Sequence, residues 1–173
     1  MLVRRAALAG SGGLEAIRDH LIDDCSLARR IKRGGAIWLG LSGRVHSLCA
    51  YGRLGDIWDM VRRTAFTQLG HSALALAGTV FAMTGLYLVP PAAVLVGAVT
   101  GEAALALAGL AAWLLMCLAY WPTPDFYGMP AWRAPLLPAA ALFFTLMTVD
   151  SACRHWAGRG GAWKGRTYTK GHR

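Results

Sequence analysis

The chain has 173 residues, of which 55% are hydrophobic and only 16% are charged, and its mean hydropathy is +0.41. Typical globular domains carry about a quarter charged residues. The charge is uneven: residues 1–70 have a net charge of +5, residues 71–153 a net charge of −2, and residues 154–173 a net charge of +6. A middle of 83 residues with four formal charges is typical of a membrane protein. This pattern excludes a soluble single domain, a disordered chain and a secreted disulfide scaffold.

The first 53 residues alternate apolar stretches with turn signals. Short strands are predicted at residues 1–3, 36–41 and 44–49. A helix with one apolar stripe is predicted at 14–22, and a second helix follows to Arg33, where the Gly34-Gly35 pair ends it. No secretory signal is visible, because charged residues interrupt the first 30 positions.

Residues 54–71 predict an amphipathic helix. Its apolar side chains recur at helical spacing, and Arg62 and Arg63 lie on another side. Because the helix directly precedes an apolar segment, we expect it to lie in the membrane interface, with Trp58 and Phe66 at headgroup depth. An ordinary surface helix packed on a globular core is the alternative.

Three apolar segments follow, at 72–97, 102–121 and 134–151, and 153–173 is a basic tail. Their lengths are close to the roughly 20 residues that cross the hydrocarbon layer. The pair Pro90-Pro91 is expected to interrupt the first segment. Three crossings would place the two basic ends on opposite faces, whereas the positive-inside rule favours the same face. An even number requires either that one apolar segment is re-entrant or interfacial, or that the first segment crosses twice around Pro90-Pro91, which leaves about 10 residues for each leg, too few for a helix. The sequence favours three apolar helices and leaves the side of the tail open.

The basic excess also admits nucleic-acid binding, but the basic clusters flank apolar segments and contain no zinc or RNA-binding motif. We therefore expect anionic lipid rather than nucleic acid beside these clusters. The four cysteines, Cys25, Cys49, Cys117 and Cys153, show no metal spacing and are interpreted as reduced, small apolar side chains.

The adjacent acids Asp23 and Asp24 are the strongest candidates for chemistry. They stand where a helix starts, so one can cap the helix while the other faces a cleft and accepts a proton from a hydroxyl nucleophile. From the pair alone, two capping charges that favour the helix dipole are the more common arrangement.

The stretch from Gly12 to Gly35 resembles the second half of the catalytic domain of family 2 glycosyltransferases, which have a GT-A fold. In that family a Gly-Gly-(Phe/Leu) turn precedes an acidic pair, and the resemblance implies that Asp24 is the base that deprotonates the acceptor hydroxyl. Asp23 replaces the more common Glu. The resemblance also matches Gln68 to the first residue of a Gln-x-x-Arg-Trp motif that helps to hold the nucleotide diphosphate and the acceptor. His71 stands in place of Arg there, and Ser72 in place of Trp.

The chain is most similar to the hopene-associated subgroup, and the similarity covers nearly its whole length. The matching stretches are 21–25, 28–35, 37–41, 55–61, 64–69, 150–152, 154–156 and 158–166. The resemblance implies an inverting, membrane-bound transfer of a sugar from a nucleotide donor to a lipid, plausibly a hopanoid. It also predicts the fold class, namely an α+β N-terminal remnant of a GT-A domain followed by an all-α transmembrane region of about three helices. The predicted location is the bacterial inner membrane, with the N-terminal part in the cytoplasm.

The family's donor-binding half, with its βαβ region and Asp-x-Asp metal motif, has no counterpart in the sequence. The resemblance therefore implies a C-terminal portion that is inactive alone, a partner that supplies the N-terminal half, and a Mg²⁺ or Mn²⁺ ion whose ligands lie outside this chain. The competing hypothesis is a small non-catalytic membrane protein that docks or stabilises a partner.

Overall fold

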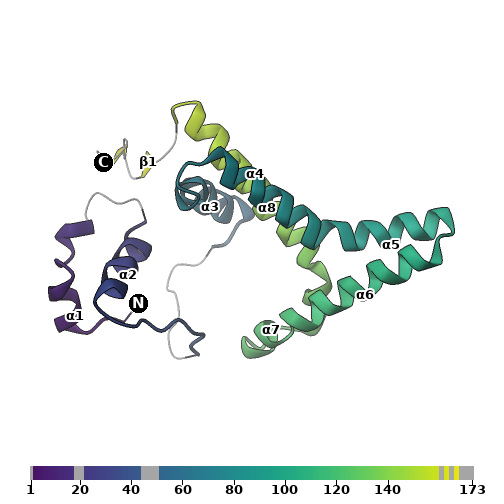
Figure 1. Cartoon of the computed structure of the whole chain (residues 1–173), viewed down its shortest axis with the longest axis horizontal. Coiled ribbons are helices and arrows are strands. Elements are labelled where there is room, and N and C mark those ends of the chain that lie inside the picture. Colours follow the sequence, from purple (N-terminus) through teal and green to yellow (C-terminus); the bar gives the residue numbers. More distant parts are fainter. Residues whose placement is uncertain (1, 18–21, 44–50, 160–161, 164–165, 168–173) are drawn as a thin grey trace.

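The computed structural model describes residues 2–17, 22–43, 51–159, 162–163 and 166–167. Figure 1 shows a helical chain in which α3, α4 and α8 meet on one side, while α5 and α6 extend away from them.

The N-terminal part is helical, so the predicted α+β remnant of a GT-A domain is wrong. It consists of α1 (Arg5–Gly10), the 3-10 turn η1 (Glu15–Ile17) and α2 (Asp23–Gly34). The predicted strand at 36–41 is irregular and exposed, residues 2 and 3 are also irregular, and the strand predicted at 44–49 lies outside the described residues. A strand needs partners to satisfy its backbone groups, and the described part of this region offers no partner strand for 36–41. Two short strands, β1 (Ala162–Trp163) and β2 (Arg166–Thr167), pair antiparallel in the basic tail.

Helix α3 (Leu54–Gln68) leads into a 28-residue helical rod from Ala73 to Thr100. The rod comprises α4 (Ala73–Met83), the π-helical turn η2 (Thr84–Leu88) and α5 (Val89–Thr100). The expected interruption at Pro90-Pro91 does not occur. The prolines occupy the first turn of α5, where missing N–H groups cost little, and Val89 N–H donates five residues back to the Thr84 carbonyl. The π turn thus allows the helix to continue through the two prolines without a break.

Helix α6 (Ala103–Tyr120) runs back along α5 after a tight turn at Gly101, whose φ of 76° is left-handed. The two backbones approach closely, because a Cβ on Gly97 would lie 2.5 Å from the Ala106 nitrogen and one on Gly109 would lie 2.8 Å from the Pro90 carbonyl oxygen. Small residues commonly permit such approach between membrane helices. The α5–α6 hairpin is therefore packed backbone to backbone.

Three elements complete the apolar region: α7 (Pro122–Phe126), the 3-10 turn η3 (Ala131–Leu136) and α8 (Leu137–Trp156). Within the described residues, three helical stretches are long and apolar enough to cross a membrane: Ala73–Thr100, Ala103–Phe126 and Ala131–Trp156. The expectation of about three apolar helices is confirmed. The rest of the protein covers little of them. In the most apolar 18-residue stretch of each helix, 6% of the residues are buried in the first two helices and 22% in the third.

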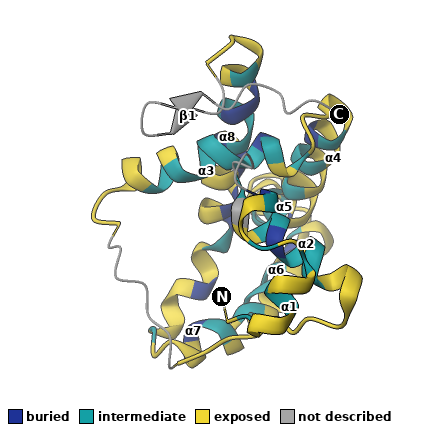
Figure 2. Cartoon of the chain, turned by 90° about the vertical axis from the view of Figure 1, so that its left-hand side faces the viewer, coloured by how far each residue is buried: buried dark blue, intermediate teal, exposed yellow. Residues whose placement is uncertain are grey.

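Burial concentrates where α3, α4 and α8 meet. Phe66, Leu76 and Ala152 form the buried cluster, with Leu69, Val80 and Val149 packed against it. Figure 2 shows few buried positions, in dark blue, and exposed residues in yellow along most helices. Many of the exposed side chains on α5 and α6 are leucines and valines, including Leu95, Val99, Leu107, Leu115 and Leu118. Such surfaces fit a hydrocarbon solvent, in which helices satisfy their own backbone groups.

Candidate functional site at the α3–α8 junction

Polar and aromatic side chains gather where α3 crosses the end of α8, and we call this set the junction cluster. Its members are Trp58, Arg62, Phe66, His71, Asp150, Ser151, Arg154, His155 and Trp156. They come from α3, from the turn before α4 and from the last two turns of α8. Chain segments more than 80 residues apart in the sequence thus form a single surface.

Asp150 is the charged centre of the cluster. The Trp58 indole N–H donates to Asp150 Oδ2 at 2.8 Å, and Arg62 Nη1 lies 3.8 Å from the same oxygen. Arg154 Nε, one turn further along α8, lies 3.6 Å from Asp150 Oδ1. A carboxylate within an apolar helix is costly unless charges and donors surround it. Asp150 therefore joins α8 to α3 through Trp58 and Arg62.

Phe66 is the buried anchor of the cluster, with 1% of its surface exposed. Its ring meets the rings of His71, His155 and Trp156 edge to face, with centroids 5.3–5.5 Å apart. Its backbone N–H donates to Ser151 Oγ at 3.0 Å. Edge-to-face contacts add to the stabilisation from burial, so one side chain holds α3 and the end of α8 together.

His71 has an unusual backbone. Its φ of 57° is the only positive φ of a non-glycine residue in the described part of the chain, and it follows Gly70 at 61°. The left-handed conformation costs an ordinary residue about 1–2 kcal/mol. It brings the imidazole onto His155, where the ring centroids are 4.2 Å apart and the planes differ by 18°. His71 Nε2 also lies 3.4 Å from Thr67 Oγ1. Strain at a polar residue is a common feature of functional sites.

The residues predicted from the sequence fall into two neighbouring places. Gln68, the last residue of α3, donates from Nε2 to Cys25 Sγ at 3.3 Å, which brings the end of α3 beside the start of α2. Asp24 lies next to Cys25 in the first turn of α2, is exposed, and accepts the Cys25 N–H on Oδ1 at 2.7 Å. Asp23 begins α2, whose N-cap position is Ile22, so neither acid occupies the cap itself. The structure thus connects Asp24 to Gln68 through Cys25, and His71 to the junction cluster.

The placement of Trp58 and Phe66 at headgroup depth stays a prediction. Both turn toward α8, where Trp58 meets Asp150 and Phe66 is buried. Sequence reasoning also missed Asp150, Ser151 and His155 as site residues. Asp150 carried a usable signal, because an acid inside a 20-residue apolar helix requires a partner. His155 carried none, because its significance comes from a contact with a residue far away in the sequence.

The residues present do not suit a metal ion. Among the described residues, no group of three or more His, Cys, Asp or Glu side chains lies close enough together to bind one. A divalent ion needs several oxygen or nitrogen ligands around it. No step in this chain is therefore assigned to a metal.

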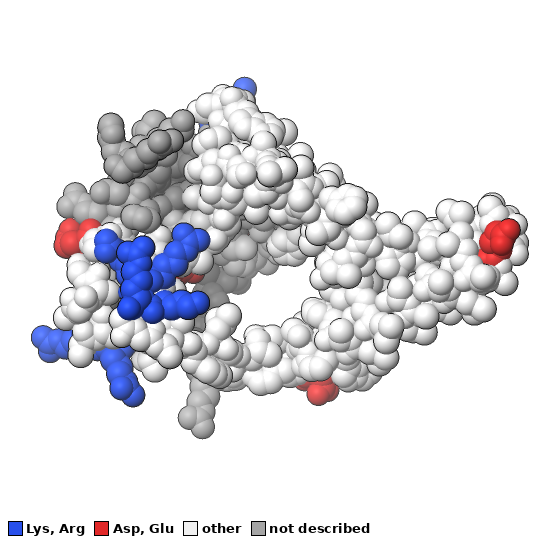
Figure 3. All heavy atoms as spheres, viewed as in Figure 1, with Lys and Arg blue, Asp and Glu red and all other residues white. Residues whose placement is uncertain are grey.

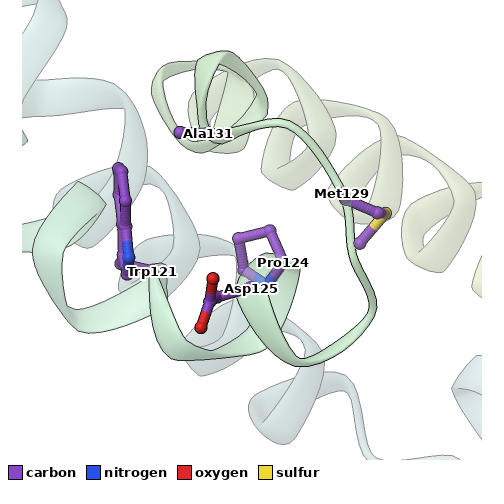
Figure 4. Close-up of a pocket in the computed structure, with 5 residues that line it drawn as sticks. All are labelled: Trp121, Pro124, Asp125, Met129 and Ala131. Atoms are coloured by element: carbon purple, nitrogen blue, oxygen red, sulfur yellow. The ribbon is translucent and has the colours of Figure 1, made fainter.

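A small cavity lies at the other end of α8, between α7 and η3. Its volume is about 100 Å³, and its lining residues are Trp121, Pro124, Asp125, Met129 and Ala131. Figure 4 shows the Asp125 carboxylate and the Trp121 ring on the same side of the cavity. Pockets for drug-sized ligands run to about 300–1,000 Å³, so this cavity is too small for a nucleotide sugar.

The comparison with protein families gives one match: residues 1–170 match the model described as Glycosyl transferase family 21. It supports the glycosyltransferase relationship inferred from the motifs, although the matching family is 21 rather than 2. No curated protein and no solved structure matches the chain.

Proposed function

Because the chain belongs to glycosyl transferase family 21, we propose that it is the membrane-facing part of an enzyme that transfers a sugar from a nucleotide donor to a lipid acceptor. The observation that carries the proposal is the location of the motif residues. Asp24 of α2 is connected through Cys25 to Gln68 at the end of α3, and His71 lies in the turn just before the first apolar helix. A lipid acceptor must present its hydroxyl at such a boundary, since its tail stays in hydrocarbon while the nucleotide donor stays in water.

Asp24 is the proposed general base. Its side chain is exposed, and Oδ1 accepts the Cys25 N–H. An ionised carboxylate has the lone pairs to accept a hydroxyl proton. In an inverting transfer the acceptor oxygen bonds to the anomeric carbon, and the bond to the nucleoside diphosphate breaks. The hydroxyl proton passes to the Asp24 carboxylate. A base positioned in this way typically contributes 10²–10⁴-fold to the rate.

Gln68 and His71 are proposed to hold polar groups of the acceptor or the diphosphate. Gln68 is held by Cys25, and His71 is held by stacking on His155. Imidazole and amide N–H groups are suitable donors to anionic oxygens. Because both side chains are already held in one orientation, binding costs less conformational entropy. The strained backbone of His71 fits this role, because strain persists where the side chain serves a purpose beyond folding.

The proposal includes a hopanoid-type acceptor, because the hopene-associated stretches span residues 21–166. It also includes a separate donor-binding part that brings the nucleotide sugar and any divalent ion, since the sequence contains no Asp-x-Asp motif. We place the enzyme in the bacterial inner membrane with α1 and α2 in the cytoplasm. Basic residues on α1 and α2 agree with the positive-inside rule.

The test is reconstitution. We expect the purified 173-residue chain in lipid vesicles to transfer no label from radiolabelled nucleotide sugars to extracted bacterial lipid, and co-expression with a donor-binding half to restore transfer. Asp24→Asn should then reduce transfer by 10² or more, since an amide cannot take the proton. Asp59→Asn is the matched control, because Asp59 is an exposed acid that pairs with Arg62 on α3, away from α2. Turnover by the chain alone, or full activity of Asp24→Asn, would contradict the proposal.

The non-catalytic membrane protein remains the second candidate. Three apolar helices and a basic tail are the features that suit it. In that case the junction cluster only docks a partner. Variants at Asp24 and His71 would then leave transfer by the assembled complex unchanged, whereas Phe66→Ala would dissociate it.

A further inference from the structure

Contacts of the junction cluster tie the beginning of the apolar region to its end. Phe66, six residues before Ser72 and the start of α4, donates its N–H to Ser151 of α8, and His71 stacks on His155. Phe66 also meets Trp156, the last residue of α8, with ring centroids 5.5 Å apart. The level at which the chain enters α4 is therefore the level at which it leaves α8.

These contacts determine whether the chain crosses the membrane an even or an odd number of times. The hydrocarbon layer is about 30 Å thick, so three complete crossings would separate the start of α4 from the end of α8 by that distance. Rings 4–6 Å apart do not allow it. We propose that the chain makes two complete crossings of the membrane, through a hairpin of α4–α5 and α6, and that α8 enters the apolar layer beside α4 and ends on the side of α3.

Helix lengths identify the two crossing segments. The rod Ala73–Thr100 has 28 residues and is about 42 Å long, and Ala103–Phe126 has 24 residues and is about 36 Å long. Both exceed the hydrocarbon thickness, and the close contacts of Gly97 and Gly109 hold their far halves antiparallel. Figure 1 shows α6 and α7 returning from the α5–α6 turn toward the side that holds α3. The turn at Gly101 and Glu102 is then the part exposed on the opposite face.

Helix α8 contacts α4 and η2 and ends beside α3, so it runs along the first half of the rod and need not cross completely. It carries Asp150, Arg154 and His155 in its last two turns, which need water or polar partners. Exposed apolar side chains at Leu142, Phe143 and Leu146 can dip into the acyl chains while the opposite surface packs on α3 and α4. Protein also covers more of this helix than of the other two: 22% of its most apolar stretch is buried, against 6% in each of the others.

The distribution of charge agrees with a two-crossing hairpin. Figure 3 shows basic side chains gathered over α1 and α2, at the end of the molecule opposite the α5–α6 turn. Glu102 is the charged residue of that turn, and between Glu102 and Arg63 the sequence has no Lys, Arg, Asp or Glu. The gathering of Lys and Arg on one face, with none in the turn on the other, is the arrangement that the positive-inside rule favours.

Cysteine labelling tests the topology independently of sugar transfer. In a background with Cys25, Cys49, Cys117 and Cys153 changed to serine, single cysteines replace Asp59, Glu102, Tyr127 and Arg159. A membrane-impermeant maleimide is applied to spheroplasts that express the full chain, with permeabilised cells as the control. We expect labelling of the Glu102→Cys variant in intact spheroplasts, and labelling of the other three only after permeabilisation.

Each other outcome overturns the proposal in a defined way. A side for Arg159→Cys opposite to that of Asp59→Cys would mean an odd number of crossings. Tyr127→Cys sharing the side of Glu102→Cys would make α8, rather than α6, the returning span, and Glu102→Cys on the side of Asp59→Cys would mean that the hairpin does not cross. If the variant with serine at the four cysteine positions fails to accumulate, a fluorescent protein fused after Arg173 of the native chain reports the side of the tail instead. Fluorescence is expected, and its absence at normal protein level contradicts the proposal.

Discussion

The α3–α8 junction and the α5–α6 hairpin are held together by different kinds of contact. At the junction, aromatic rings meet around Phe66, a hydroxyl accepts its backbone N–H, and a carboxylate accepts from Trp58. In the hairpin, Gly97 and Gly109 let two backbones touch, and the large side chains point outward. The junction is thus specified by side-chain chemistry and the hairpin by the absence of side chains.

The difference follows from the solvent that each region faces. Between helices in hydrocarbon there is no hydrophobic driving force, so close van der Waals packing between small residues provides the association. The junction includes charged and polar groups that require partners, and it can use water, burial and hydrogen bonds together. A mutation that deletes a large side chain should therefore harm the junction most, and one that adds a side chain should harm the hairpin most.

Phe66→Ala should have the largest effect. The ring is 1% exposed and contacts three other rings, and truncating a buried Phe typically costs about 3–5 kcal/mol. We expect α3 to detach from α8, as measured by faster protease cleavage between residues 54 and 72 and by a lower denaturation midpoint in detergent. Phe81→Ala is the control, since that ring is 81% exposed on α4. Equal losses for the two variants would show that the junction does not depend on Phe66.

Gly109→Leu should come next. A Cβ at this position would lie 2.9 Å from Ala93 Cβ and from the Val94 nitrogen, so the helices must separate. Overpacking of this kind typically costs about 1–3 kcal/mol. The measurement is the denaturation midpoint together with crosslinking between cysteines placed on α5 and α6. Gly78→Leu is the matched control, because a Cβ on Gly78 in α4 would meet nothing within 4 Å. Unchanged crosslinking in Gly109→Leu would show that the hairpin is not packed through this glycine.

Much of the helical apolar region was predictable from the sequence, because length and hydropathy alone decide which segments suit a membrane. The prediction of about three apolar helices was confirmed. The predicted interruption at Pro90-Pro91 was wrong, because a π turn precedes the prolines and the helix continues through them. No local sequence pattern predicts that turn. The predicted α+β part was wrong because the apolar run at 36–41 has strand-like composition but no neighbouring strand in the described part of the chain.

The candidate site was predictable only in part. Asp24, Gln68 and His71 were singled out by a motif, which reports spacing along the chain. Asp150 and His155 entered through contacts spanning 92 and 84 residues, respectively, and such contacts depend on how α8 packs on α3. The strain at His71 was also invisible, because a left-handed backbone is expected at glycine and His71 follows one. The roles of the motif residues in catalysis stay predictions.

The smallest expected effect belongs to the Trp58–Asp150 pair, and it tests whether the junction is specified by polar contacts as well as by Phe66. Trp58→Phe removes the N–H donor and keeps most of the ring, so we expect a loss of roughly 1 kcal/mol, which is ordinary for one hydrogen bond to a partly exposed charged acceptor. Asp150→Asn retains an acceptor for Trp58 but loses the attraction of Arg62 and Arg154. A double-mutant cycle measured by denaturation in detergent should give a positive coupling energy. Zero coupling would leave Phe66 and the aromatic rings as the sole source of specificity, and would remove Asp150 as a residue that joins α8 to α3.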